Sequence, residues 1–100
     1  MINETNSHPL SLPDLIKERR TNLGLTQEQV ANALRVVPEA VGYWERRKRR
    51  IDLDHVLSLA AILQLDQQDV CRLALFEHYP RVHAALFGTE RPPQPRHLEQ

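Results

Sequence analysis

A run of basic side chains and a scatter of histidines are the residues of this chain whose types and spacing could do chemistry. Positions 46–50 read Arg, Arg, Lys, Arg and Arg, enough cationic charge in one segment to bind nucleic-acid phosphates. A merely solvated loop is the alternative interpretation of such a run. The five histidines and the single cysteine form no spaced ligand set, so we expect no metal site and no cofactor. With no nucleophile–base pair and no phosphate-loop motif, we expect no catalytic residues and no enzyme activity.

The charged residues are unevenly distributed along the chain, although they cancel overall. There are 13 Lys and Arg against 13 Asp and Glu, a formal net charge of zero. Residues 35–50 hold six basic and two acidic side chains, whereas residues 51–80 hold one basic side chain, Arg72, and five acidic ones. A basic part beside an acidic part is typical of a protein that offers one face to phosphate.

The length of 100 residues suits one domain with one core. Residues 1–10 are polar and are predicted to be a flexible arm, and the proline-containing residues 89–100 are predicted to be a disordered tail. The start lacks the apolar run of a signal peptide, and no stretch approaches the roughly 20 apolar residues of a membrane span. A cytoplasmic protein with no membrane partner is therefore expected.

Capping residues and apolar spacing predict an all-α fold of five or six helices. The expected starts are Ser11, Thr26 with Gln29 in a capping box, Pro38, Asp52 or Asp54, and Asp66, and a short sixth helix follows Pro80. Gly24 and Gly88 are predicted to end the first and last of these helices. The apolar stripe expected to bury the fourth helix is Leu53, Val56, Leu57, Ala60 and Leu63.

The stretch from Leu12 to Leu65 resembles the Cro/CI-type helix-turn-helix, also called the XRE family. The resemblance is carried by Arg20, then Gly24-Leu25-Thr26-Gln27, then Val30-Ala31, and then Glu45-Arg46 before the basic run. It implies a phage-repressor-like domain over residues 11–65 whose partner is double-stranded DNA. In this family the second helix of the motif lies in the major groove, which is about 12 Å wide and admits one helix.

The resemblance also implies roles for individual residues. Thr26 and Gln27 would face phosphate at the start of the second helix, with Gln27 bracing the recognition helix. Arg20 and Glu45 fall where the family often has a buried ion pair. The base-facing positions of the recognition helix would be Pro38, Glu39, Ala40, Gly42 and Tyr43. The loop that follows the DNA backbone would be Arg46, Arg47, Lys48, Arg49 and Arg50.

Three departures from the family pattern concern the turn and the recognition helix. Arg35 stands where the turn often has Gly, so a left-handed backbone is expected there at a cost of roughly 1 kcal/mol. Val37 replaces the usual capping Ser or Thr. The base-facing set has no Arg, Asn or Gln, although Glu39 could accept a bond from cytosine N4 and Ala40 could meet a thymine methyl.

Residues 66–88 are predicted to be C-terminal helices that form a dimerisation element. The segment from Val70 to Phe87 leaves almost no polar face, and one neighbouring helix can cover only one of its sides. The proposed dimer interface is Leu75, Phe76, Val82, Leu86 and Phe87. A two-fold dimer would set two recognition helices about one DNA turn, ~34 Å, apart. A larger monomeric core is the alternative.

The function expected from these features is that of a sequence-specific transcription regulator, a repressor that binds a palindromic operator as a homodimer. The alternative is a protein-interaction module, such as an antitoxin that binds a toxin, or an adaptor, using the apolar C-terminal helices. The zero net charge and the donor-poor recognition helix favour the alternative. The basic run and Gln27 favour DNA binding.

Overall fold

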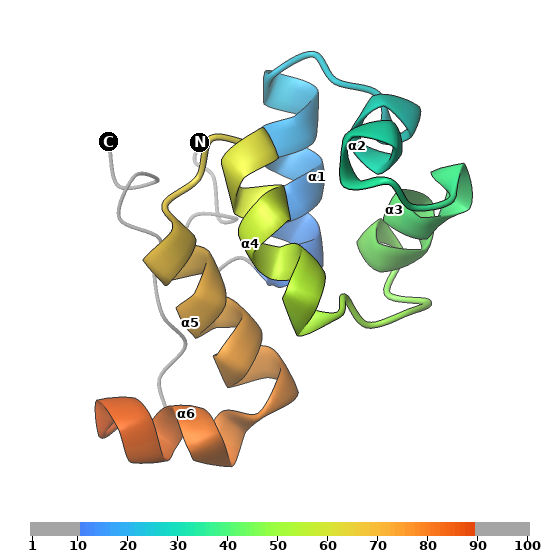
Figure 1. Cartoon of the computed structure of the whole chain (residues 1–100). Helices are drawn as coiled ribbons and strands as arrows, with labels where there is room; N and C mark the ends of the chain where they lie inside the picture. The colour runs from blue at the N-terminus through green and yellow to red at the C-terminus, as the bar shows by residue number, and fades with distance from the viewer. Residues whose placement is uncertain (1–10, 90–100) are drawn as a thin grey trace, which may run out of the picture.

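The computed structural model describes residues 11–89, which form six helices and no strand (Figure 1). The helices are α1 (Leu12–Asn22), α2 (Gln27–Leu34), α3 (Pro38–Glu45), α4 (Leu53–Ile62), α5 (Gln67–His78) and α6 (Pro80–Phe87). The predicted all-α class is confirmed. The predicted arm (residues 1–10) and residues 90–100 of the predicted tail lie outside the described residues.

Three helix starts follow the capping chemistry that the sequence predicts, whereas the side chain of Asp52, the N-cap of α4, makes no capping hydrogen bond. The Ser11 hydroxyl accepts a hydrogen bond from the Asp14 N–H at 3.3 Å, and the Asp66 carboxylate accepts one from the Asp69 N–H at 2.9 Å. Thr26 and Gln29 form a complete capping box, with bonds of 3.0 and 2.8 Å. These bonds satisfy N–H groups that have no partner inside the helix, and so they fix where each helix begins.

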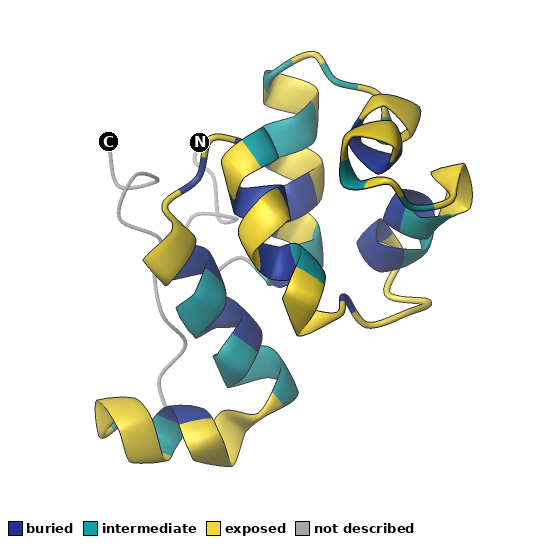
Figure 2. Ribbon diagram, in the orientation of Figure 1, coloured by how far each residue is buried: buried dark blue, intermediate teal, exposed yellow. Residues whose placement is uncertain are grey.

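One core holds α1 to α5 together (Figure 2). Helix α1 packs against α3 and α5, and α2 packs against α3 and α4. The core includes Leu15, Val30, Val41 and Leu59, all at most 2 % exposed. Trp44 is 5 % exposed, so this aromatic side chain belongs to the core and is no stacking platform for bases. Helix α3 is therefore fixed to the core through the buried side that carries Val41 and Trp44.

The predicted apolar stripe of α4 is wrong at two positions. Leu53 and Leu57 are 42 % and 48 % exposed, whereas Leu59 is buried. The buried face runs through Val56, Leu59, Ala60 and Leu63, an i, i+3, i+4, i+7 pattern. Leu53 and Leu57 lie on the flank of this face, where neither α2 nor α5 covers them.

Helix α6 packs on α5 and projects from the rest of the bundle (Figure 1). His83, one of the five histidines for which no metal site is expected, is only 2 % exposed. Its ring lies between Phe76, with centroids 5.3 Å apart, and Phe87, at 4.8 Å. These contacts fix the angle at which α6 leaves α5. No helix among residues 11–89 combines the length and apolarity needed to cross a bilayer.

Candidate nucleic-acid interface

The turn between α2 and α3 is held by a left-handed arginine. Arg35 has φ 62° and ψ 41°, as the sequence predicts for this position. The following Val36 N–H donates to the Ala31 carbonyl at 3.0 Å, which closes the end of α2. Helix α3 then begins at Pro38 without a side-chain cap from Val37. The turn brings the N-terminus of α2 beside the outer face of α3.

A buried carboxylate ties α1, α2 and α3 to one another. The Glu45 side chain is 2 % exposed and accepts two bonds from Arg20, from Nε at 2.7 Å and from Nη2 at 3.0 Å. Gln27 Nε2 donates to the same carboxylate at 2.9 Å. Arg20 Nη1 also donates to the Leu25 carbonyl at 2.8 Å. The pair implied by the family resemblance is thus a bidentate one, and Gln27 is fixed against the end of α3.

A groove runs between the N-terminus of α2 and the outer face of α3. Its lining comprises Gln27, Glu28, Pro38, Glu39, Gly42, Tyr43 and Arg46. Pro38 and Glu39 are exposed and Tyr43 is half-buried, so these three side chains are available to a ligand in the groove. Thr26 is exposed at the first turn of α2. Glu28 was not among the predicted site residues, although it directly follows Gln27 in the stretch that resembles the family.

The structure places two of the predicted base-facing positions, Ala40 and Gly42, differently from Pro38 and Glu39. Ala40 is half-buried and packs against the core. It lies in a neighbouring groove with Val36, Trp44 and His55, on the side of Tyr43 that faces α4. Gly42 is buried, because the side chains of Arg46 and Gln27 lie directly over it. Gly42 therefore presents no surface of its own to a base, whereas Ala40 is partly exposed in the neighbouring groove.

The basic loop after α3 is exposed throughout residues 46–50 (Figure 2). The guanidinium carbons of Arg46 and Arg49 lie 5.5 and 5.4 Å from the centroid of the Tyr43 ring, within the range of a cation–π contact. The Lys48 N–H donates to the Tyr43 carbonyl at 2.8 Å. Tyr43 therefore organises both the end of α3 and the cations that follow it.

A family model described as a helix-turn-helix matches residues 16–66, which include all of α2, α3 and the basic loop. The chain belongs to this Cro/CI-type (XRE) helix-turn-helix family. It is a DNA-binding transcription regulator of that type. No curated protein and no solved structure matches the chain.

Arg47 is turned away from the other cations of this helix-turn-helix. Its backbone has φ 62°, and its Nη2 lies 2.7 Å from Ser11 Oγ and 3.1 Å from Asp14 Oδ2. The Arg47 guanidinium therefore lies at the start of α1, and its contact with phosphate stays a prediction. The sequence carries no signal for the left-handed backbone, since Arg47 stands where such helix ends usually have Gly.

Glu77 joins α5 to the same end of α1 in this helix-turn-helix protein. Its Oε2 accepts a bond from the Leu12 N–H at 2.6 Å. Burial raises the pKa of Glu77 above its usual value of about 4.5, and the charge of Asp14 adds to this, while the Leu12 bond and Arg47 oppose it. The folded chain therefore holds the Glu77 proton to a higher pH than the unfolded chain does.

We expect the Glu77 proton to stabilise the fold as the pH falls. The contribution is complete below the unfolded pKa of about 4.5 and is lost as the pH rises through the folded pKa. Urea unfolding of wild type and Glu77→Gln at pH 7 and pH 5 should show the wild type gaining free energy of unfolding relative to the variant at pH 5. If the free energies of unfolding of wild type and Glu77→Gln differ by the same amount at pH 7 and pH 5, this would contradict the raised pKa of Glu77.

The metal-ligating side chains of the described residues are dispersed over the fold. No group of three metal-ligating side chains comes together anywhere in residues 11–89. Cys71 is half-buried on α5, and burial raises the pKa of its thiol, which lowers its reactivity at neutral pH.

Proposed function

We propose that the protein is a transcription repressor that binds a palindromic operator as a homodimer, with α3 of each copy in a major groove. The observation that carries this proposal is the exposed groove face of α3 with the basic loop directly after it. A dimer bound over a promoter represses by occluding polymerase.

The proposed DNA contacts divide into positioning and reading. Lys48 and Arg49 are exposed on the loop and would neutralise phosphates, as would Arg50. Thr26 and Gln27 stand at the N-terminus of α2, where free N–H groups favour an anion. Glu39 and Tyr43 face the groove and would contact base edges. Phosphate contacts fix the position of the protein on the duplex, and base contacts supply the preference for sequence.

Replacing Lys48 or Arg49 by Ala should weaken binding to all duplexes alike. Each lost phosphate contact should reduce the slope of log K against log salt by about 0.9. The measurement is a fluorescence-anisotropy titration of a random-sequence duplex at several salt concentrations. Lys17→Ala, which removes an exposed cation from α1, is the matched control and should leave the slope unchanged. An unchanged slope in both loop variants would remove the loop from the DNA interface.

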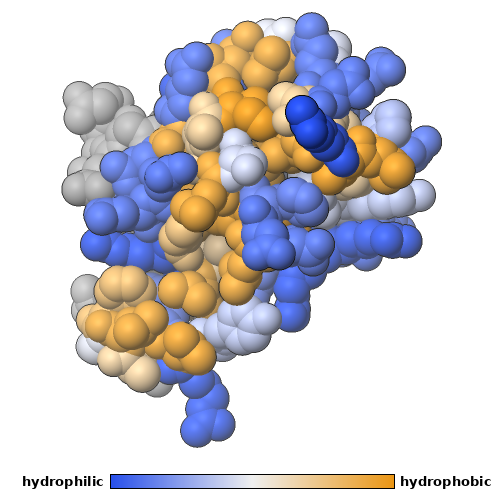
Figure 3. Space-filling model, viewed as in Figure 1, coloured by the Kyte–Doolittle hydropathy of each residue, from blue (hydrophilic) through white to orange (hydrophobic). Residues whose placement is uncertain are grey.

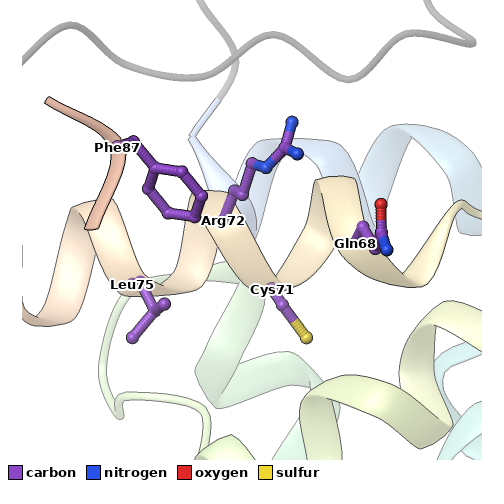
Figure 4. Close-up of a pocket in the computed structure, with 5 residues that line it drawn as sticks. All are labelled: Gln68, Cys71, Arg72, Leu75 and Phe87. Carbon is purple, nitrogen blue, oxygen red and sulfur yellow. The ribbon is translucent and has the colours of Figure 1, made fainter. Parts of the chain in front are cut away.

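The proposed dimer surface is the apolar face of α5 and α6. Val82, Leu86 and Phe87 are 48 %, 63 % and 41 % exposed, and Figure 3 shows apolar side chains gathered over the projecting helix. Leu75 and Phe87 line a pocket with Gln68, Cys71 and Arg72 (Figure 4). An apolar side chain of a second copy could fill this pocket, and Phe76 lines another pocket between α5 and α6. Exposed apolar surface of this kind on a small regulator favours a two-fold interface.

The same apolar face supports a second candidate function. An antitoxin or adaptor would cover α6 with a different protein, and α3 would then need no base preference. The observation that favours this candidate is the lack of Arg, Asn or Gln among residues 38–45. The two candidates differ in the oligomeric state of the purified chain, since an adaptor without its partner has no need to self-associate.

Selection from a random duplex pool tests the proposed repressor. The purified chain should recover a palindrome whose half-sites have centres about 10 base pairs apart at about 150 mM salt. Recovery of no motif would overturn the sequence-specific proposal and favour the interaction module.

A further inference from the structure

The recognition helix exposes no hydrogen-bond donor of the kinds that usually read a purine. Its groove-facing residues are Pro38, Glu39 and Tyr43. Arg, Lys, Asn and Gln make the common bidentate contacts to guanine or adenine in the major groove, and none of them occurs within α3. A donor for a purine must therefore come from a neighbouring segment.

Gly42 makes room for such a donor on the surface of α3. A Cβ at this position would lie 3.0 Å from Arg46 Nη1 and 3.2 Å from Gln27 Oε1. Side chains on a helix lean toward its N-terminus, so the Arg46 guanidinium lies one turn back from its own Cα. It thus covers the middle of α3, where the glycine has no side chain.

The Arg46 guanidinium contacts the Tyr43 ring but forms no salt bridge among the described residues. Its carbon lies 5.5 Å from the Tyr43 ring centroid, and no carboxylate among residues 11–89 lies within 4 Å of it. The nearest buried carboxylate, Glu45, is already paired with Arg20. A stacked guanidinium loses little freedom when it binds, and its N–H groups remain available.

We propose that Arg46 is a base-reading residue that donates two bonds to O6 and N7 of a guanine in each half-site. The inference rests on the proposed function and goes beyond it by naming the reader and its base. Arg49 makes a similar contact with Tyr43 but lies in the groove on the other side of that ring, beyond the end of α3, and contacts phosphate. Gly42 is a positioning residue, since it leaves the space in which Arg46 lies.

The test uses the full chain and the duplex recovered by selection. Titrations compare wild type with Arg46→Ala, Gly42→Ala and Arg49→Ala on that duplex and on versions with each G·C pair replaced in turn. Wild type should lose at least about tenfold in affinity when one particular guanine is replaced. Replacing only that guanine by 7-deazaguanine, which lacks the N7 acceptor, should weaken wild-type binding as well.

The variants should distinguish a loss of base preference from a loss of folded protein. Arg46→Ala should bind the duplexes with and without that guanine equally well. Gly42→Ala should show the same loss of preference through displacement of Arg46, although alanine raises helix propensity and so favours folding. Arg49→Ala should weaken binding to all the duplexes and keep the preference for that guanine. A recovered motif whose guanine preference survives Arg46→Ala would overturn this inference and leave the proposed function standing, whereas recovery of no motif by wild type would overturn both.

Discussion

Glu45→Ala is expected to lower the free energy of unfolding by about 3–5 kcal/mol, because it strands a buried guanidinium. Glu45 accepts two bonds from Arg20 and one from Gln27, at 2.7 to 3.0 Å. The Arg20 side chain is only 11 % exposed, so its charge is largely removed from water and depends on the carboxylate. Urea denaturation followed by circular dichroism measures the loss. Glu39→Ala removes an exposed acid from the same helix and should change stability by well under 1 kcal/mol.

A double variant shows whether the loss comes from the stranded charge. Replacing both partners by apolar residues of similar volume, Arg20→Met with Glu45→Leu, removes the buried charge altogether. The double variant should therefore be more stable than Glu45→Ala alone, although Gln27 and the Leu25 carbonyl lose a partner. A loss for Glu45→Ala no larger than that for Glu39→Ala would mean that the pair does not hold α3 to α1.

Leu86→Asp is expected to convert the proposed dimer into a folded monomer. Leu86 is 63 % exposed on α6, so the carboxylate is solvated in the monomer but would be buried without a partner at a dimer interface. The helical signal should persist while light scattering shows half the wild-type mass. Operator affinity should fall by about a hundredfold or more, because the second half-site is no longer linked to the first.

The matched control for this experiment is Leu57→Asp. Leu57 is a leucine of similar exposure, 48 %, but it lies on α4 outside the proposed interface. It should leave the mass unchanged. A wild-type chain that is already monomeric at micromolar concentration, or a Leu86→Asp variant that remains dimeric, would contradict the interface assigned to α6.

Local chemistry explains which parts of the fold could be predicted from the sequence. The capping box at Thr26 and the cap at Ser11 depend on residues three apart in the chain, so their partners are visible in the sequence. The left-handed backbone at Arg35 is expected from the family resemblance, because Arg35 stands where the turn often has Gly. Val41 and Trp44 are three positions apart, as residues on one face of a helix are, and both are buried.

The features that could not be predicted depend on which distant elements meet. Leu53 and Leu57 have helical spacing with the core positions, and only the angle between α4 and its neighbours decides that they are exposed. Arg47 donates a hydrogen bond to Asp14, which is 33 positions away in the sequence. The cover over Gly42 needs both the end of α3 and the start of α2 in place. Such contacts follow from tertiary packing and leave no local pattern.

The most direct test of the central claim, two copies of α3 presented by one dimer to successive major grooves, is to change the half-site spacing. Inserting five base pairs between the half-sites of the selected palindrome turns one by about half a helical turn relative to the other. We predict that affinity on this duplex falls to that of a single half-site, while wild-type mass in solution remains that of a dimer. Equal affinity for the two spacings would contradict the claim, since independent subunits would not sense the rotation.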